Sequence, residues 1–160
     1  MITIKFKTNE KEEFDLDSLD MVNFDESQFH TAIFSGLSLY KTSFIKANLR
    51  SAELSRCYLD RAVFVEALLM NANLTYSVLT GADFSYSKLS GACFFKADVR
   101  NANFIHADLF GAKFNDADLR GTDFSDALRI DSASFDNALY DDKTIWPENF
   151  STDLKRLILV

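Results

Sequence analysis

Histidine and cysteine, the side chains that often act as bases, nucleophiles or metal ligands, are few in this chain and widely spaced. The 160 residues include two histidines, His30 and His106, and two cysteines, Cys57 and Cys93. Zinc ligands come in closely spaced pairs, and a nucleophile needs its base within hydrogen-bond reach. The sequence has neither a Cys-x-x-Cys pair nor a phosphate-binding glycine loop. We therefore expect no catalytic residue, no cofactor and no bound metal, and we predict that the chain is not an enzyme.

Asp and Asn side chains are plentiful, but they recur at one place, directly before a large apolar residue. Examples are Asn73, Asp83, Asp98, Asn103, Asp108 and Asp118. A side chain that repeats in this way is expected to bond to neighbouring repeats and not to act on a substrate. The repeats also leave no long loop that could build a pocket. These residues therefore direct attention to the repeating unit that positions them.

A large apolar residue recurs at every fifth position from Phe14 to Phe124. The uninterrupted series is Phe14, Leu19, Phe24, Phe29, Phe34, Leu39, Phe44, Leu49, Leu54, Leu59, Phe64, Leu69, Leu74, Leu79, Phe84, Leu89, Phe94, Val99, Phe104, Leu109, Phe114, Leu119 and Phe124. Alanine predominates two positions before each member of the series, from Ala32 to Thr122. The unit is thus a pentad with one large and one small inward residue.

A period of five fits neither standard element. Five residues of an α-helix turn by about 500°, so the apolar side chains would not form a stripe. On a flat strand, every second large residue would face water. All of them can be buried only if each pentad is one side of a coil, which predicts a solenoid. Phe mostly alternates with Leu, so with four pentads per coil the rings should stack on two opposite walls.

Several stretches resemble the A(D/N)(L/F)XX motif of pentapeptide repeat proteins, of the cyanobacterial type. They include Ala72-Asn73-Leu74, Gly81-Ala82-Asp83-Phe84 and Asn101-Ala102-Asn103-Phe104. More than twenty such units in phase are very specific. The resemblance implies an all-β fold, a right-handed quadrilateral parallel β-helix with four pentads in each coil.

The two ends of the chain depart from the repeat and are interpreted as caps, because an open solenoid exposes its core and its strand edges. Residues 1–11 should form a capping strand, residues 12–140 the β-helix, and residues 141–160 a cap with a short helix. In that helix Ser151 or Thr152 would cap the start, and Leu154, Leu157 and Ile158 would share a face. From Phe124 the next large residue is Ile130, so one extra residue should form a bulge or a small loop.

Acidic residues dominate the formal net charge, which is −7 at pH 7. They concentrate in residues 10–26 and 116–142, whereas residues 27–115 hold six acids and nine bases. No secretory signal or membrane-spanning apolar run is visible. We therefore expect a cytoplasmic protein that does not bind membranes. Bases stand beside acids on one wall, so we do not expect direct nucleic-acid binding.

Outward apolar residues are the strongest candidates for a functional surface. Ile45, Val65 and Ile105 occupy equivalent positions on the wall of the Phe24–Phe124 ladder, and Val63 and Tyr86 belong to the same wall. Stacked at about 5 Å per coil, they would merge into a patch. The apolar terminus, residues 157–160, either caps its own core or joins two copies as a homodimer through the C-terminal end.

Two functions fit this chain. The first is a non-enzymatic scaffold or protein-protein interaction module whose partner the sequence does not identify. The alternative, implied by the resemblance, is a DNA mimic that binds DNA gyrase or another topoisomerase and protects it from fluoroquinolones. Mimicry predicts continuous acidic walls, whereas this chain places bases in the middle of the barrel.

Overall fold

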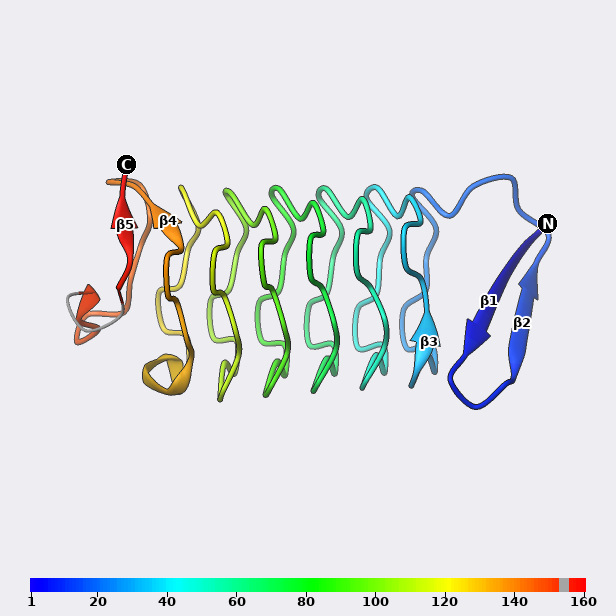
Figure 1. Cartoon of the computed structure of the whole chain (residues 1–160). Helices are drawn as coiled ribbons and strands as arrows, with labels where there is room; N and C mark the ends of the chain where they lie inside the picture. The colour runs from blue at the N-terminus through cyan, green and yellow to red at the C-terminus, as the bar shows by residue number, and fades with distance from the viewer. Residues whose placement is uncertain (153–155) are drawn as a thin grey trace.

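The structure, a computed structural model of the whole chain, describes residues 1–152 and 156–160 and is a rod of stacked coils (Figure 1). From Asn23 to Leu128, every fifth residue forms a parallel backbone bridge with the residue four pentads further on, as in Asn23↔Ser43 and Gln28↔Asn48. Four successive bridges complete one coil, so each coil has four sides. The predicted β-helix solenoid is thereby confirmed.

Regular elements are short because each side of a coil contributes only one bridged residue. The described elements are β1 (Ile2–Phe6), β2 (Lys11–Phe14), β3 (Ala32–Ile33), the 3₁₀ helix η1 (Ile130–Ser132), β4 (Leu139–Tyr140) and β5 (Ile158–Leu159). The hairpin of β1 and β2 lies at one end of the rod, and β4 and β5 lie at the other (Figure 1).

The chain turns each corner at a residue in the left-handed region, which L side chains adopt at a cost. Lys46 and Glu66 have φ values of 57°. The corner amide also joins the coils, because the Lys46 N–H donates to the Val65 carbonyl at 2.9 Å. At Gly91 and Gly121 a Cβ would clash with the side-chain oxygen of an asparagine in the preceding coil. A side chain fits at these two corners only if that asparagine side chain moves.

Two columns of phenylalanine rings fill the core, as the alternation of Phe and Leu predicts. Along one wall the Phe64 ring stacks on Phe84 with centroids 4.7 Å apart and nearly parallel planes. On the opposite wall Phe94 stacks on Phe114 at 4.6 Å. The columns meet edge to face, as at Phe84 and Phe94 with centroids 5.6 Å apart. This arrangement leaves no room for a channel, because aromatic rings, leucines and alanines fill the interior.

Hydroxyl and thiol groups replace alanine at several inward positions, and they donate to backbone carbonyls. Thr42 Oγ1 donates to the Leu19 carbonyl at 2.7 Å, and Thr122 Oγ1 donates to the Val99 carbonyl at 2.8 Å. Cys57 Sγ does the same to the Phe34 carbonyl at 3.0 Å. Each of these acceptors belongs to the preceding coil. Burial of the three polar groups is therefore compensated.

An antiparallel hairpin covers the first coil. Strand β1 pairs with both β2 and β3, so the sheet order is β2-β1-β3. Ile4 is fully buried, and the Phe6 ring lies 6.5 Å from Phe29. Phe14, the first residue of the five-residue series, belongs to β2 and is only half-buried. The division of the chain into an N-terminal cap (residues 1–11), a β-helix (residues 12–140) and a C-terminal cap (residues 141–160) stays a prediction.

The extra residue after Phe124 is accommodated beside the last coils. Arg129 adopts the left-handed conformation, with φ 56°, and η1 follows it. Beyond it the bridged partners lie one position further apart than in the regular coils, as in Lys113↔Ser134, and two positions further apart at Asp123↔Ile145. The predicted bulge or small loop is thus a 3₁₀ turn, after which the parallel bridges between coils continue.

The prediction of a short C-terminal helix containing Leu154, Leu157 and Ile158 is wrong for Ile158. Ile158 and Leu159 form β5, which pairs in parallel with β4. The Ile158 N–H donates to the Ala138 carbonyl at 2.9 Å, so the open edge of the last coil determines the backbone conformation here. The predicted helix also included residues 153–155, which lie outside the described residues.

Candidate interaction surface

The five predicted surface residues all belong to one wall, which we call the ladder wall. It comprises residues 22–26, 42–46, 62–66, 82–86, 102–106 and 122–126. Ile45, Val63, Val65 and Ile105 are half-buried, whereas Tyr86 is 55% exposed. Tyr86 lies at the corner of its coil, with φ 59°, and so projects from the edge of the wall.

The structure brings these residues together as two groups. Ile45, Val63 and Val65 lie in two consecutive coils, joined through the Ser43↔Val63 bridge. Ile105 is separated from Val65 by Ser85, which is only 9% exposed. The Tyr86 ring packs on His106 with centroids 4.8 Å apart, and the Tyr86 N–H donates to the Ile105 carbonyl at 3.0 Å.

Carboxylates surround these apolar groups. The acidic residues of the ladder wall are Asp25, Glu26, Glu66, Asp83, Asp123 and Asp126. The single Lys or Arg on the wall, Lys46, lies 3.7 Å from the Glu66 carboxylate. A partner for this wall should therefore bring apolar side chains together with positive charge.

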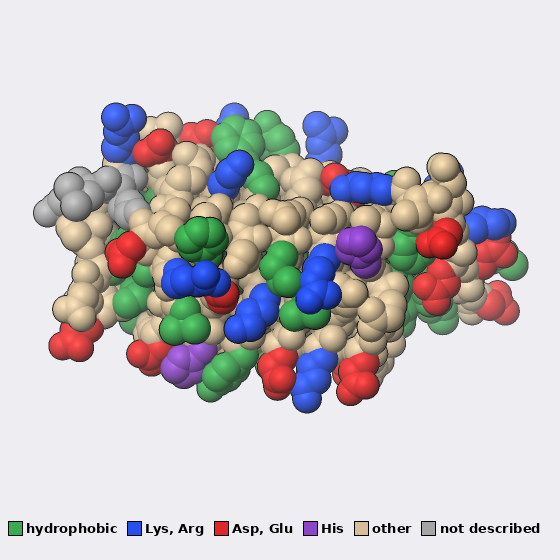
Figure 2. Space-filling view, turned by 90° about the horizontal axis from the view of Figure 1, so that it is seen from below, with side chains coloured by type: hydrophobic (Ala, Val, Ile, Leu, Met, Phe, Trp, Pro, Cys, Tyr) green, Lys and Arg blue, Asp and Glu red, His purple; other side chains and the backbone are tan. Residues whose placement is uncertain are grey.

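The adjoining wall has the opposite character, and we call it the basic wall. It comprises residues 27–31, 47–51, 67–71, 87–91, 107–111 and 127–129. Figure 2 looks onto this wall, where Lys and Arg side chains alternate with hydrophobic ones along the rod. Its basic residues are Arg50, Lys88 and Arg129, and its outward apolar residues are Leu68, Met70, Phe110 and Leu128. Phe110 and Leu128 are 52% and 49% exposed.

The acidic residue of the basic wall, Asp108, forms an ion pair with Arg129, which lies just before η1. The Arg129 guanidinium donates to both Asp108 carboxylate oxygens and lies over the Phe110 ring, 4.8 Å from its centroid. Burial alone would raise the pKa of Asp108, but the hydrogen bonds from Arg129 and the Phe110 amide hold that pKa below its usual value. Asp108 is therefore ionised and paired at neutral pH.

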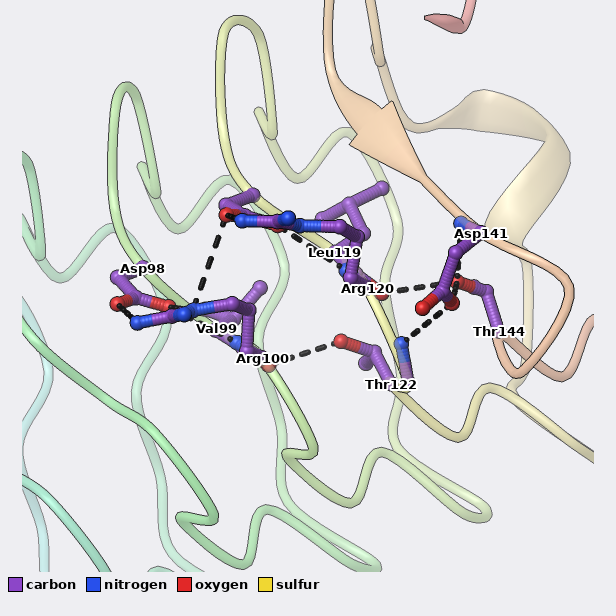
Figure 3. A network of polar contacts seen from close by, with 10 residues as sticks. Asp98, Val99, Arg100, Leu119, Arg120, Thr122, Asp141 and Thr144 are labelled. Carbon is purple, nitrogen blue, oxygen red and sulfur yellow. Dashed lines mark hydrogen bonds and ion pairs between the residues drawn. The ribbon is translucent and has the colours of Figure 1, made fainter. Parts of the chain in front are cut away.

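On the wall opposite the basic wall, two arginines form ion pairs with neighbouring aspartates (Figure 3). Arg100 donates to both carboxylate oxygens of Asp98, at 2.8 and 2.6 Å, and lies 3.7 Å from the Asp118 carboxylate. Arg120 binds Asp118 in the same two-pronged way. Burial would raise the pKa of Asp98, yet the bonds from Arg100 keep that pKa lowered. These two arginines are therefore paired with carboxylates of their own wall.

Surface depressions exist but are shallow. One of about 410 Å³ is lined by Cys93, Phe95, Lys113, Asn115, Asp116, Asp136 and Asn137. Within residues 1–152 and 156–160, no group of three or more His, Cys, Asp or Glu side chains is arranged to hold a metal ion. In the same part of the chain, no helix has the length and apolar character needed to cross a bilayer.

Sequence reasoning finds the ladder-wall residues but misses the basic wall as a unit. Leu68 and Leu128 occupy the bridged position, where Asp and Asn are common, and so do not stand out in a single pentad. The signal is nevertheless present, because residues one coil apart share a wall. When charged residues are grouped by their position within each coil, the acidic ladder wall is distinguished from the basic wall. Counting charges along the chain does not reveal this difference.

The sequence model of the Pentapeptide repeats family matches eight copies, over residues 23–61, 62–101 and 87–126. These segments cover most of the chain and coincide with the bridged coils. The chain belongs to the pentapeptide repeat family. The resemblance seen in the A(D/N)(L/F)XX motifs is therefore confirmed. No curated protein sequence matches the chain.

Solved structures of other pentapeptide repeat proteins are similar to this one. HetL from the cyanobacterium Nostoc sp. strain PCC 7120, involved in heterocyst differentiation regulation, aligns with a TM-score of 0.59 and 22% identity over 85% of this chain and 69% of HetL. Rfr23 from the cyanobacterium Cyanothece 51142 aligns with a TM-score of 0.45 and 21% identity, over 85% of this chain and 71% of Rfr23. QnrB1, a plasmid-mediated fluoroquinolone resistance protein, aligns with a TM-score of 0.42 and 23% identity, over 92% of this chain and 86% of QnrB1. The similarity to HetL shows the fold alone.

Proposed function

We propose that this right-handed solenoid is a non-enzymatic interaction module that presents its ladder wall to a protein partner in the cytoplasm. The observation that carries the proposal is the stacking of Ile45, Val63 and Val65 on a rigid wall bordered by carboxylates. Apolar side chains grouped on a regular surface favour association with another protein. The walls hold their side chains on a hydrogen-bonded backbone, so binding requires little ordering.

A pull-down with cross-linking tests the proposal. Val65→Lys places a charge in the middle of the patch, and Thr75→Lys makes the same change at the equivalent position of the opposite wall. The fold should tolerate both, because Arg50, Arg100 and Arg120 occupy that position elsewhere. We expect the partner captured by the wild type to be lost with Val65→Lys and kept with Thr75→Lys. Equal capture by both variants would contradict the proposal.

A second contact is proposed at the C-terminal end, where two copies could join as a homodimer. Ile158, Leu159 and Val160 are 43%, 65% and 60% exposed, and β5 is the outer strand of its two-stranded sheet. An exposed apolar edge strand is a template for pairing. Light scattering on the intact chain and on Leu159→Lys tests this contact: we expect a dimer that the substitution converts to a monomer.

DNA mimicry towards a gyrase or another topoisomerase is the alternative function, and one observation favours it. The ladder wall carries six carboxylates and one lysine, which is a more continuous acidic surface than the order of charges along the chain suggests. A gyrase supercoiling assay distinguishes the two functions. Inhibition of supercoiling by the wild type that is lost in Glu66→Lys would support mimicry. If gyrase activity is unaffected by the wild type, the interaction module remains the favoured function.

A further inference from the structure

The corner diagonally opposite the one shared by the ladder wall and the basic wall carries aromatic and basic side chains in three consecutive coils. We call its turn residues, 55–56, 75–76 and 95–96, the aromatic corner. Arg56, Tyr76 and Lys96 have φ values of 56°, 59° and 54°, so they occupy the same left-handed position of three successive turns. Their backbones are stacked at about 4.8 Å per coil. Side chains at this spacing contact one another along the rod.

The Tyr76 ring is held between two cations. The Arg56 guanidinium, from the preceding coil, lies over the ring at 5.7 Å from its centroid, and the Lys96 ammonium, from the following coil, lies over it at 6.0 Å. Lys96 also lies 5.2 Å from the centroid of Phe95, whose ring meets Tyr76 edge to face at 5.9 Å. Cation–π attraction holds both charges close to the tyrosine. The part of Tyr76 that is left to solvent is therefore its edge.

The two cations of the aromatic corner are not paired with an acid. In the part of the chain that the structure describes, neither Arg56 nor Lys96 forms an ion pair, and both side chains are exposed. The remaining residues of the corner are uncharged, namely Ser55, Thr75, Tyr76 and Phe95. Both positive charges therefore remain for an anion from outside the chain.

The exposed edge of Tyr76 suits such an anion. An aromatic ring is negative on its faces and positive along its edge, so the ring edge and the two cations attract the same ligand. The phenol hydroxyl can donate a hydrogen bond, and the Arg56 guanidinium can bind both oxygens of a carboxylate. Lys96 adds a second positive charge from the other side. A carboxylate at the edge of Tyr76 would thus be bound by three side chains from three coils.

An acidic peptide fits this site better than a nucleic acid does. A base stacks on an open aromatic face, whereas cations already lie over the Tyr76 ring. Acids also border the corner: Glu53 accepts a hydrogen bond from the Asn73 amide at 2.6 Å, and Asp116 occupies the same corner position one coil after Lys96. A nucleic acid carries a phosphate at every nucleotide and would meet these acids. A peptide can place carboxylates only where the cations lie.

From these contacts we infer that the aromatic corner binds an acidic segment of a partner protein, with one carboxylate at the edge of Tyr76 between Arg56 and Lys96. The ladder wall selects apolar side chains together with positive charge, whereas this corner selects negative charge. The rod would therefore bind two chemically different partners at diagonally opposite corners. The inference goes beyond the proposed function and does not depend on it.

An NMR titration of the isotope-labelled full chain with a short peptide tests the site. In the probe peptide glutamate alternates with serine, and in the matched peptide glutamine replaces glutamate. Alternate residues of an extended peptide point to the same side, so all the glutamates can face the rod. We expect the backbone amide signals of Arg56, Tyr76 and Lys96 to shift with the glutamate peptide, and to shift less at high salt. Equal shifts with the glutamine peptide would overturn the inference.

Substitutions in the aromatic corner identify the groups that bind the peptide. Arg56→Gln and Lys96→Gln should each weaken binding of the glutamate peptide by about tenfold, the loss of one hydrogen bond to a charged group. Tyr76→Leu keeps both charges but removes the ring that positions them, and it should weaken binding as well. Arg61→Gln is the matched control, because Arg61 occupies the same left-handed position at the next corner of its coil, with φ 55°. The control should bind the peptide nearly as the wild type does.

Three results with these proteins would contradict the inference. If Arg61→Gln weakens binding as much as Arg56→Gln, the overall charge of the rod is responsible and not the corner. If Tyr76→Leu binds like the wild type, the ring does not position the cations. If a single-stranded oligonucleotide of the same charge binds more tightly than the peptide, the corner is a nucleic-acid site. Capture of a partner that is lost with Val65→Lys would remain in each case, so failure of this inference is distinguishable from failure of the proposed function.

Discussion

The indole ring of Trp146 stacks on Phe124 with centroids 5.1 Å apart and planes 8° from parallel. It therefore continues the ladder of phenylalanine rings beyond the last pentad. Phe150 stacks in turn on Trp146 at 4.7 Å. The ladder therefore ends in side chains of the cap, which cover the last phenylalanine ring of the column.

Phe84 lies in the middle of this ladder and is fully buried. We expect Phe84→Ala to lower the free energy of unfolding by about 3–5 kcal/mol, because it removes a ring and leaves a cavity between two stacked neighbours. Tyr86→Ala, in the same coil but exposed, is the matched control and should change stability little. Urea denaturation of both variants measures the difference, and equal losses would refute the assignment of inward and outward positions.

Substitutions at Trp146 can separate the contribution of ring stacking to stability from the cost of its unpaired polar atom. Its Nε1–H is buried and has no hydrogen-bond acceptor among the described residues. Trp146→Phe keeps an aromatic ring on Phe124 and removes that unpaired group, so we expect a change within about 1 kcal/mol. Trp146→Leu loses the stacking and should be clearly less stable. Thermal melts followed by circular dichroism rank the two, and a Phe variant as unstable as the Leu variant contradicts this reasoning.

The two free thiols should differ sharply in reactivity. Burial raises the pKa of Cys57 to about 11, and its Sγ donates to the Phe34 carbonyl. Cys93 is half-buried and borders the shallow depression on its wall. A thiol reagent should therefore modify one group per native chain and two after unfolding. In Cys93→Ser the native reaction should disappear; a persisting reaction would place Cys57 within reach of solvent.

The pair of Asp108 and Arg129 should make stability depend on pH. The folded pKa of Asp108 lies below that of an unfolded aspartate, about 3.9. The pair thus stabilises the fold above roughly pH 4, and the contribution is lost as pH falls through the folded pKa. Denaturation midpoints of wild type and Arg129→Gln should differ at pH 7 and converge in acid. A constant difference down to pH 2 would show that another contact of Arg129 is responsible.

The sequence predicts the inward residues well, because burial at a five-residue period allows one solution. Thr42 and Cys57 break the alanine pattern, yet the preceding coil offers each a carbonyl acceptor. The C-terminal segment is predicted less well. Spacing of apolar residues favours a helix through Ile158, whereas the open edge of β4 supplies backbone partners that local pattern does not reveal. The candidate surface is predicted only in part, since the charge of a wall depends on residues one coil apart.

One coil consists of four pentads, and each pentad forms one wall of the coil. The number of pentads between two residues therefore determines whether they lie on the same wall. Removing one pentad from the middle would turn everything beyond the cut by a quarter, and the ladder wall would continue into the basic wall. Removing a whole coil would only shorten the rod. A single extra residue, as at Arg129, is diverted sideways into η1. Insertions and deletions therefore change which faces are continuous while the aromatic interior stays periodic, and new surfaces can arise without a single substitution.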